Sequence, residues 1–185
     1  MPRRENDFYP TPAWATVELL HRINLSGMRR ILEPCAGNGA IAAVLKRAWG
    51  EDRVITNDID PQWGCDAELD ACDDKLYNIV DADAIITNPP FSLAHVIVPK
   101  AVESAHVVCA MLLRLSWLEP VMNRDQWLAE NPPDRLIVLP RISFTGDGKT
   151  DSVTCGWYIW QKTPIRGKHI EVIPRFNRQV VNAKQ

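Results

Sequence analysis

Short apolar runs alternate along this chain with segments whose apolar residues recur at helical spacing. Strands are expected over residues 29–33, 54–59, 84–87, 106–113, 135–139 and 153–160. Helices are expected over residues 40–49 and from Ser92 onward, with Ser92 itself as the N-cap. The alternation predicts an α/β sandwich with a mostly parallel central sheet.

The last two expected strands have no helix between them. Residues 142–152 join them and contain the turn-forming sequence Thr-Gly-Asp-Gly-Lys. This connection is typical of a hairpin, so we expect one antiparallel strand at an edge of the sheet. The acidic segment 62–77 gives no clear indication of helix or strand.

Size and composition favour one globular unit. A length of 185 residues supports one ordinary core, so a single domain is expected over residues 1–185. The apolar fraction of 46% and the charged fraction of 24% are in the globular range. No apolar run reaches membrane-spanning length, and the N-terminal MPRRENDFYP lacks the apolar core of a signal peptide. The sequence therefore predicts a soluble cytoplasmic protein with no membrane partner.

The cysteines and histidines indicate neither a metal site nor a disulfide framework. The five cysteines are an odd number without a Cys-x-x-Cys pair, and the four histidines are scattered. A zinc site needs ligands clustered at short spacings. We therefore expect no metal, and reduced thiols that fill small spaces in the core.

Charge is distributed unevenly along the chain. Residues 51–83 hold eleven acidic and two basic residues, whereas residues 161–185 hold six lysines and arginines and Glu171 alone. A basic end is compatible with contact to nucleic acid, although solvated charged tails are also common.

A glycine-containing loop follows the first expected strand. Residues 33–39 read Glu-Pro-Cys-Ala-Gly-Asn-Gly and lead into a helix. In open α/β sheets ligands bind beyond the carboxyl ends of strands, where glycine lets the backbone approach closely. The loop lacks the dinucleotide and phosphate-loop spacings, and the Glu33 carboxylate would repel phosphate but suit a cationic amino group. Taken alone, such a loop is most often an ordinary turn.

A second carboxylate stands at the end of the second expected strand. Asp58 lies about twenty residues beyond the glycine loop, the register at which a carboxylate accepts hydrogen bonds from the ribose of an adenosine-containing cofactor. Asp60, which precedes Pro61, is equally typical of a turn or a helix cap.

The most specific signal is the tetrapeptide Asn88-Pro89-Pro90-Phe91, which directly follows an apolar strand. The prolines stiffen the chain and remove backbone donors, leaving a rim of acceptors. The Asn88 side-chain oxygen and the Pro89 carbonyl could accept both protons of an amino group on a flat ring. Phe91 could stack on that ring. In isolation the tetrapeptide would predict only a turn.

With these motifs the chain resembles the class I S-adenosylmethionine-dependent methyltransferases. It is most similar to the amino-group enzymes with an Asn-Pro-Pro-Phe motif, in particular the small DNA adenine-N6 methyltransferases of phages and prophages. The resemblance covers nearly the whole chain and implies a Rossmann-like methyltransferase sandwich. It also implies S-adenosyl-L-methionine as cofactor, DNA as partner and Asn88, Pro89, Pro90 and Phe91 as catalytic residues.

The resemblance also assigns cofactor-binding residues. These are Tyr9 and Thr11 in an N-terminal Phe-Tyr-Pro-Thr-Pro segment, the loop residues Glu33, Pro34, Cys35, Ala36, Gly37 and Gly39, and Asp58, Ile59 and Asp70. Asp70 is chosen from several aspartates, Asp66, Asp73, Asp74 and Asp81 among them, for contact with the cofactor adenine.

On the substrate side, Phe91 and Phe144 are expected to stack on a flipped base, although Phe144 could equally be a core aromatic of the hairpin. Trp117 is a further candidate for a substrate contact. There is no room for a separate target-recognition domain, so sequence preference would come from loops such as 116–133 or from a homodimer. Methylation of an RNA guanine amino group or a protein glutamine remains an alternative, as does an inactive nucleic-acid-binding module of the same fold.

Overall fold

The fold is built on one seven-stranded sheet. The computed structural model describes residues 9–122, 124–142, 153–163 and 169–174. Within these residues the strands follow the order β2-β1-β3-β4-β6-β5-β7. Their bounds are Ile31–Glu33 for β1, Val54–Thr56 for β2, Ala84–Thr87 for β3, Val108–Arg114 for β4, Arg135–Val138 for β5, Cys155–Gln161 for β6 and Ile170–Val172 for β7.

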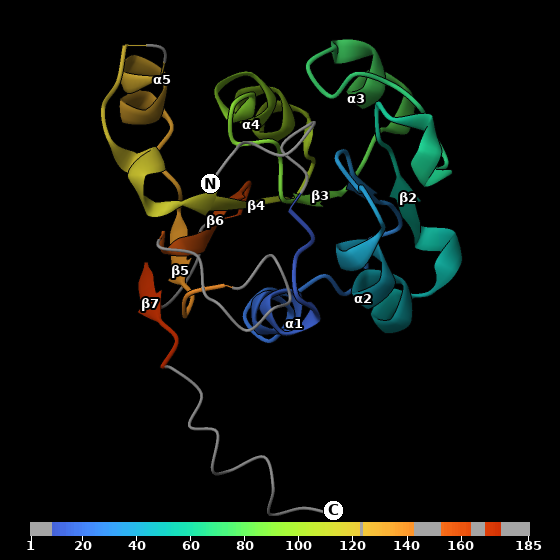
Figure 1. Cartoon of the computed structure of the whole chain (residues 1–185), viewed down its shortest axis with the longest axis horizontal. Coiled ribbons are helices and arrows are strands. Elements are labelled where there is room, and N and C mark those ends of the chain that lie inside the picture. The colour runs from blue at the N-terminus through green and yellow to red at the C-terminus, as the bar shows by residue number, and fades with distance from the viewer. Residues whose placement is uncertain (1–8, 123, 143–152, 164–168, 175–185) are drawn as a thin grey trace, which may run out of the picture.

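Helices cover both faces of this sheet (Figure 1). Helices α1 and α2 lie on one face, and α3, α4 and α5 lie on the other. The helices span Ala13–Leu20 for α1, Ala40–Trp49 for α2, Asp74–Val80 for α3, Ala94–Ser104 for α4 and Asp125–Glu130 for α5, and short 3-10 turns span Glu51–Arg53, Pro61–Trp63 and Leu115–Leu118.

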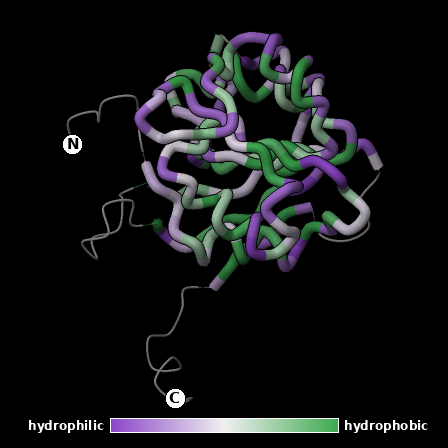
Figure 2. The backbone as a smooth tube through the Cα atoms, turned by 90° about the vertical axis from the view of Figure 1, so that its right-hand side faces the viewer, coloured by the Kyte–Doolittle hydropathy of each residue, from purple (hydrophilic) through white to green (hydrophobic). Residues whose placement is uncertain are grey.

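The central strands are apolar because both of their faces are covered. All four residues of β3 are buried. In β4, Val108, Ala110 and Leu112 belong to the core beneath α1 and α2, whereas alternate residues belong to the core beneath α3 and α4. This period-2 division is expected of a strand between two helical layers. Figure 2 shows hydrophobic segments gathered inside and hydrophilic segments at the periphery.

The predicted α/β sandwich with a mostly parallel sheet is confirmed. Strands β1, β2, β3 and β4 pair in parallel, and β5 and β6 form the expected antiparallel pair. The reversed strand β6 lies inside the sheet, however, because it also pairs with β4 and because β7 extends the sheet beyond β5. The predicted edge position of the reversed strand was therefore wrong.

Some element boundaries differ from those expected. The first two strands are shorter than predicted, at three residues each. Helix α4 begins at Ala94 with Leu93 as N-cap, so Ser92 is not the cap. The cause is the turn that follows the prolines, in which the Leu93 amide donates to the Pro90 carbonyl at 2.9 Å.

The strand order fixes where a ligand can bind. Strand β1 has β2 on one side and β3 on the other, so the connections that leave β1 and β3 diverge. Such a switch point opens a crevice at the carboxyl ends of the parallel strands. Both motifs singled out in the sequence begin there, one after β1 and the other after β3.

Gly156 in β6 allows the close approach of β5. A Cβ atom added at Gly156 would lie 2.8 Å from the Ile137 carbonyl oxygen and 3.1 Å from the Leu136 side chain. We expect Gly156→Ala to lower the free energy of unfolding by about 1–3 kcal/mol, because the backbone of β5 must shift. Urea denaturation measures this effect, with Gln161→Ala at the end of the same strand as a control. An unchanged urea midpoint for Gly156→Ala would contradict this reading.

The structure also bears on membrane-spanning helices, metal-binding groups and disulfide bonds. In the part of the chain that the structure describes, no helix is long and apolar enough to cross a membrane. The same residues contain no group of three or more histidine, cysteine, aspartate or glutamate side chains that could hold a metal ion. All five cysteines are free, and Cys109 and Cys155 are buried.

Candidate functional site

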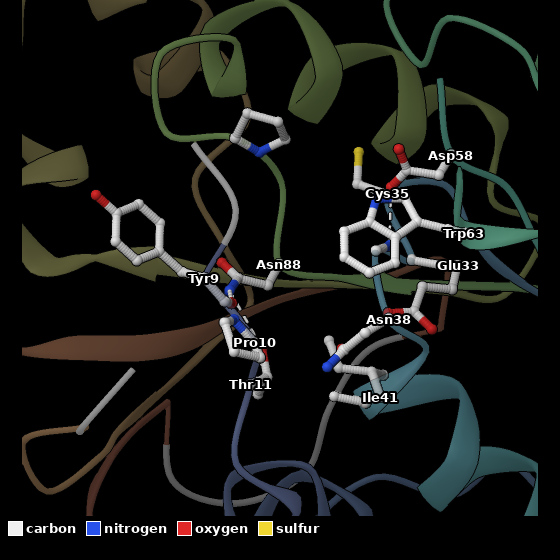
Figure 3. Close-up of a pocket in the computed structure, with 14 residues that line it drawn as sticks. Tyr9, Pro10, Thr11, Glu33, Cys35, Asn38, Ile41, Asp58, Trp63 and Asn88 are labelled. Atoms are coloured by element: carbon white, nitrogen blue, oxygen red, sulfur yellow. Dashed lines mark hydrogen bonds between the residues drawn. The ribbon is translucent and has the colours of Figure 1, made fainter. Parts of the chain in front are cut away.

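A pocket with an empty volume of about 490 Å³ opens at the switch point. In Figure 3 the N-terminal segment and Asn88 form one side of it, and the residues that follow β1 and β2 form the other. The lining residues are Tyr9, Pro10, Thr11, Glu33, Cys35, Ala36, Gly37, Asn38, Ala40, Ile41, Asp58, Trp63, Asn88 and Pro90. The pocket thus joins residues that are up to about eighty positions apart in sequence.

The glycine loop adopts a backbone shape that favours glycine. Gly37 has a φ of 52° and Gly39 a φ of 74°, both in the left-handed region. Gly39 also forms the N-cap of α2, so the loop ends where the helix begins. Of these two glycines, Gly37 lines the pocket.

Asn57, which sequence reasoning missed, holds the glycine loop in place. Its amide is fully buried and donates to the carbonyl oxygens of Pro34 and Leu69, both at 2.9 Å. Its side-chain oxygen accepts the Leu69 amide at 2.9 Å. The Ala36 amide donates to the Asn57 carbonyl, also at 2.9 Å. One buried side chain therefore ties the loop after β1 to the segment after β2.

Glu33 brings a buried carboxyl group to the floor of the pocket. Its exposed fraction is 1%, and Oε2 has no hydrogen-bond partner among the residues described. Burial raises the pKa of the Glu33 carboxyl well above its ordinary value, and the nearby charge of Asp58 raises it further, while the Ala42 backbone and Lys46 oppose this shift. A buried carboxylate without a partner is unfavourable. The pocket is therefore suited to a ligand that brings a positive charge to Glu33.

Asp58 and Trp63 form the wall on the β2 side. Asp58 Oδ2 accepts the Gly37 amide at 2.8 Å, and Oδ1 accepts the Asp60 amide at 3.0 Å. Each carboxylate oxygen has further acceptor capacity toward the pocket. Trp63 comes from the 3-10 turn that Asp60 caps, and its ring lies beside Cys35 and Asp58 (Figure 3). Sequence reasoning assigned no role to Trp63.

Asn88 is held in a fixed orientation at the end of β3. Its Nδ2 donates to the Tyr9 carbonyl oxygen at 2.9 Å and to Thr11 Oγ1 at 3.2 Å. Both hydrogen bonds to the N-terminal segment are donated by Nδ2, so they determine which end of the Asn88 amide is nitrogen and which is oxygen. Figure 3 shows the oxygen directed away from Thr11. The Asn88 side-chain oxygen thus lies on the Tyr9 side of a residue that lines the pocket (Figure 3).

Phe91 lies outside the pocket, against Tyr9 and Arg114. The rings of Tyr9 and Phe91 are nearly parallel, 20° apart, with centroids separated by 6.0 Å. The Arg114 guanidinium carbon lies 4.7 Å from the centroid of Phe91, within the range of a cation–π contact. The tetrapeptide therefore has Asn88 and Pro90 on the pocket and Phe91 beside a cation.

The structure brings together most, but not all, of the predicted site residues. Those that line the pocket are Tyr9, Thr11, Glu33, Cys35, Ala36, Gly37, Asp58, Asn88 and Pro90, and those outside its lining are Pro34, Gly39, Ile59, Asp70, Pro89 and Phe91. Asp70 accepts the Cys72 amide at 2.8 Å in a local turn, and Ile59 is 61% exposed. Phe144 lies outside the residues described.

Trp117, the tryptophan singled out as a candidate for a substrate contact, is buried in the core. It is 6% exposed and makes edge-to-face contacts with Trp127, Tyr158 and Trp160 at centroid distances of 5.8–6.1 Å. This aromatic cluster packs α5 and the 3-10 turn at residues 115–118 onto the sheet.

Several solved structures with a similar fold are described as methyltransferases. The methyltransferase subunit of a type I restriction-modification system from Streptococcus thermophilus aligns with a TM-score of 0.64 at 15% identity, over 89% of this chain and 47% of that chain. A putative RNA methyltransferase from Pyrococcus horikoshii gives 0.63 at 18% identity, over 84% and 87%. A putative class I S-adenosylmethionine-dependent methyltransferase from Listeria monocytogenes gives 0.59 at 14% identity, over 87% and 64%.

These similarities establish the fold. The chain spans about half the length of the restriction-modification subunit that it resembles. No protein-family model and no curated protein matches the sequence. The predicted resemblance to class I methyltransferases is confirmed at the level of the fold, on which the pocket occupies the crevice beyond β1 and β3.

Proposed function

We propose that this chain is an S-adenosylmethionine-dependent methyltransferase acting on an exocyclic amino group, with adenine N6 in DNA as its substrate. The observation that carries the proposal is the orientation of Asn88, whose amide protons are used by Tyr9 and Thr11 at the rim of the pocket that Glu33 and Gly37 also line. An acceptor for an amino group beside a pocket suited to a cationic ligand supports this proposal.

The pocket fits the cofactor group by group. Glu33 offers a buried carboxyl to the ammonium of the methionine part, and Gly37 lets that part lie close to the backbone. Asp58 offers acceptors for the ribose hydroxyls, and the Trp63 ring offers an apolar surface to the adenine. The cofactor supplies an electrophilic methyl group on a sulfonium.

The residues of the chain would prepare the amino group for attack. Asn88 Oδ1 and the Pro89 carbonyl accept its two protons, which localises the lone pair on nitrogen. The same oxygens then stabilise the positive charge that develops on nitrogen as its bond to the methyl group forms and the bond from that group to sulfur breaks, and the product loses one N–H proton to solvent. Because the Asn88 amide is already held by Tyr9 and Thr11, little reorganisation is needed. Positioning and electrostatics account for the acceleration, without a covalent intermediate.

The choice of DNA adenine rests on two features. The N-terminal segment resembles the cofactor motif of the DNA enzymes, and its Tyr9 and Thr11 accept hydrogen bonds from Asn88. The similar structures include the methyltransferase subunit of a type I restriction-modification system and a modification subunit of a putative type I restriction enzyme. The RNA methyltransferase among them keeps RNA as the second candidate substrate.

The test is a substrate screen with tritium-labelled S-adenosylmethionine. The protein is incubated separately with duplex DNA, single-stranded DNA, RNA and protein, and the labelled products are hydrolysed and separated. We expect label in N6-methyladenine from DNA. Label confined to an RNA guanine or to a protein glutamine would show that the proposed substrate is wrong, although methyl transfer to an amino group would still be the reaction. Failure to bind the cofactor in calorimetry would instead support the non-catalytic module.

A further inference from the structure

Arg114 is a cation in contact with the tetrapeptide. It is the last residue of β4, three positions beyond Met111, which pairs with Thr87 at the end of β3. Its guanidinium lies over the Phe91 ring. Its Nε is buried and has no hydrogen-bond partner within the described residues, and the side chain forms no ion pair with any of them. A buried donor without a partner costs free energy, so a function for it is expected.

Hydrogen bonds of the backbone and of Tyr158 fix the position of Arg114 at the end of its strand. Arg114 pairs with Cys155 in β6, and its carbonyl oxygen accepts the Tyr158 hydroxyl at 3.1 Å. The next amide, that of Leu115, donates to the Thr154 carbonyl at 3.0 Å. The backbone of Arg114 is therefore held in place by hydrogen bonds at the end of β4, and its guanidinium packs on the Phe91 ring.

The guanidinium lies outside the cofactor pocket. Asn88 and Pro90 line that pocket, whereas Phe91 and Arg114 do not. The donors of Arg114 are thus offered on the Phe91 side of the tetrapeptide, where the target ring must enter. The ligand is therefore an anionic group of the substrate rather than of the cofactor.

Charge indicates which anion this is. The Asp58 carboxylate lines the pocket and repels a polyanionic substrate near the place where its base must enter, so a cation beside that place would offset the repulsion. A planar guanidinium binds a phosphate with two parallel hydrogen bonds and tolerates an aromatic ring against its face. We infer that Arg114 binds a backbone phosphate next to the target nucleotide and so holds that nucleotide over Phe91. This inference rests on the proposed function, because it assumes a nucleic-acid substrate.

The test uses the salt dependence of binding to a fluorescein-labelled single-stranded oligonucleotide. Loss of one phosphate contact lowers the slope of log affinity against log salt by about 0.7. We expect this decrease in Arg114→Gln, together with an affinity loss of at least about tenfold at low salt. Arg114→Lys should keep the slope, since it keeps the charge. Arg47→Gln, an equal charge change at an exposed position of α2, should match the unmodified protein.

Cofactor binding and folding are measured on the same variants. Calorimetry should give unchanged affinity for S-adenosylmethionine in Arg114→Gln, and thermal unfolding identifies a folding defect. If Arg114→Gln does not fold, Arg114→Met fills the same space without the charge and takes its place. An unchanged salt slope, or loss of cofactor binding with an unchanged slope, would overturn the assignment.

The two proposals fail in different ways. A lowered slope in a protein that transfers no methyl group to nucleic acid would support the role of Arg114 and refute the proposed reaction. If the unmodified protein binds no oligonucleotide and instead methylates a glutamine-containing peptide, the reaction class stands and the phosphate role of Arg114 is refuted.

Discussion

Asn88→Ala is expected to lower the rate of methyl transfer by about 10²–10³-fold or more while the cofactor still binds. The substitution removes the acceptor that Asn88 presents at the pocket rim, and the loss of one preorganised hydrogen-bonding group of this kind has an effect of that size. The cofactor contacts attributed to Glu33 and Asp58 lie on the other side of the pocket, so we expect them to be unchanged (Figure 3). Single-turnover rates with labelled cofactor, and calorimetry for binding, measure the two quantities separately.

A control is needed because Asn88 also anchors the N-terminal segment. Thr11→Val removes one of the two acceptors of the Asn88 amide but leaves the Asn88 side-chain oxygen in place. It is expected to slow transfer by less than about tenfold, the value of one ordinary hydrogen bond. Equal losses in both variants would mean that Asn88 acts only by tethering residues 9–11. Retained turnover with lost cofactor binding in Asn88→Ala would contradict the catalytic role directly.

The site was partly predictable because two of its components are contiguous in sequence. The glycine loop and the tetrapeptide each follow a buried strand, and the carboxyl ends of parallel strands meet at one edge of the sheet. Asn57 and Trp63 could not be assigned in this way, since their positions depend on how residues 57–70 fold back along β2. The isolated bridge between Asn57 and Ala67 turns that segment toward the loop.

The fold was predicted best where periodicity was strong. Strand β3 has the expected bounds, whereas α3 was missed in an acidic stretch. A signal for α3 was present: Asp73 caps the helix by accepting the Lys75 amide at 2.9 Å, and Leu76 and Val80 are buried at helical spacing. Acidic composition concealed this short apolar face. The burial of Trp117 could not be read from the sequence, because it depends on contacts with Trp127 and Trp160 that form only in the folded chain.

Substitution of Glu33 is expected to raise the stability of the protein and to weaken its binding of the cofactor. Because the pKa of Glu33 in the folded protein is raised above the unfolded value, the folded state holds this proton more tightly. The contribution of Glu33 to stability is therefore complete below the ordinary pKa of about 4.3 and is lost as pH rises through the folded pKa. Glu33→Gln removes the penalty of the buried charge. Without cofactor and near neutral pH, we expect the free energy of unfolding of Glu33→Gln to exceed that of the unmodified protein by about 1–2 kcal/mol. This difference should shrink as pH falls toward about 4.

The same substitution should weaken cofactor binding by at least about tenfold, because a neutral amide cannot pair with an ammonium group as a carboxylate does. Calorimetry in buffers of different ionisation enthalpy adds a second readout. Below the raised pKa, binding to the unmodified protein should release a proton from Glu33, whereas binding to Glu33→Gln should release none. A variant that is stabilised but binds the cofactor with unchanged affinity would show that the buried carboxyl does not face the ammonium. A variant that is destabilised would show that the carboxyl is satisfied within the protein itself.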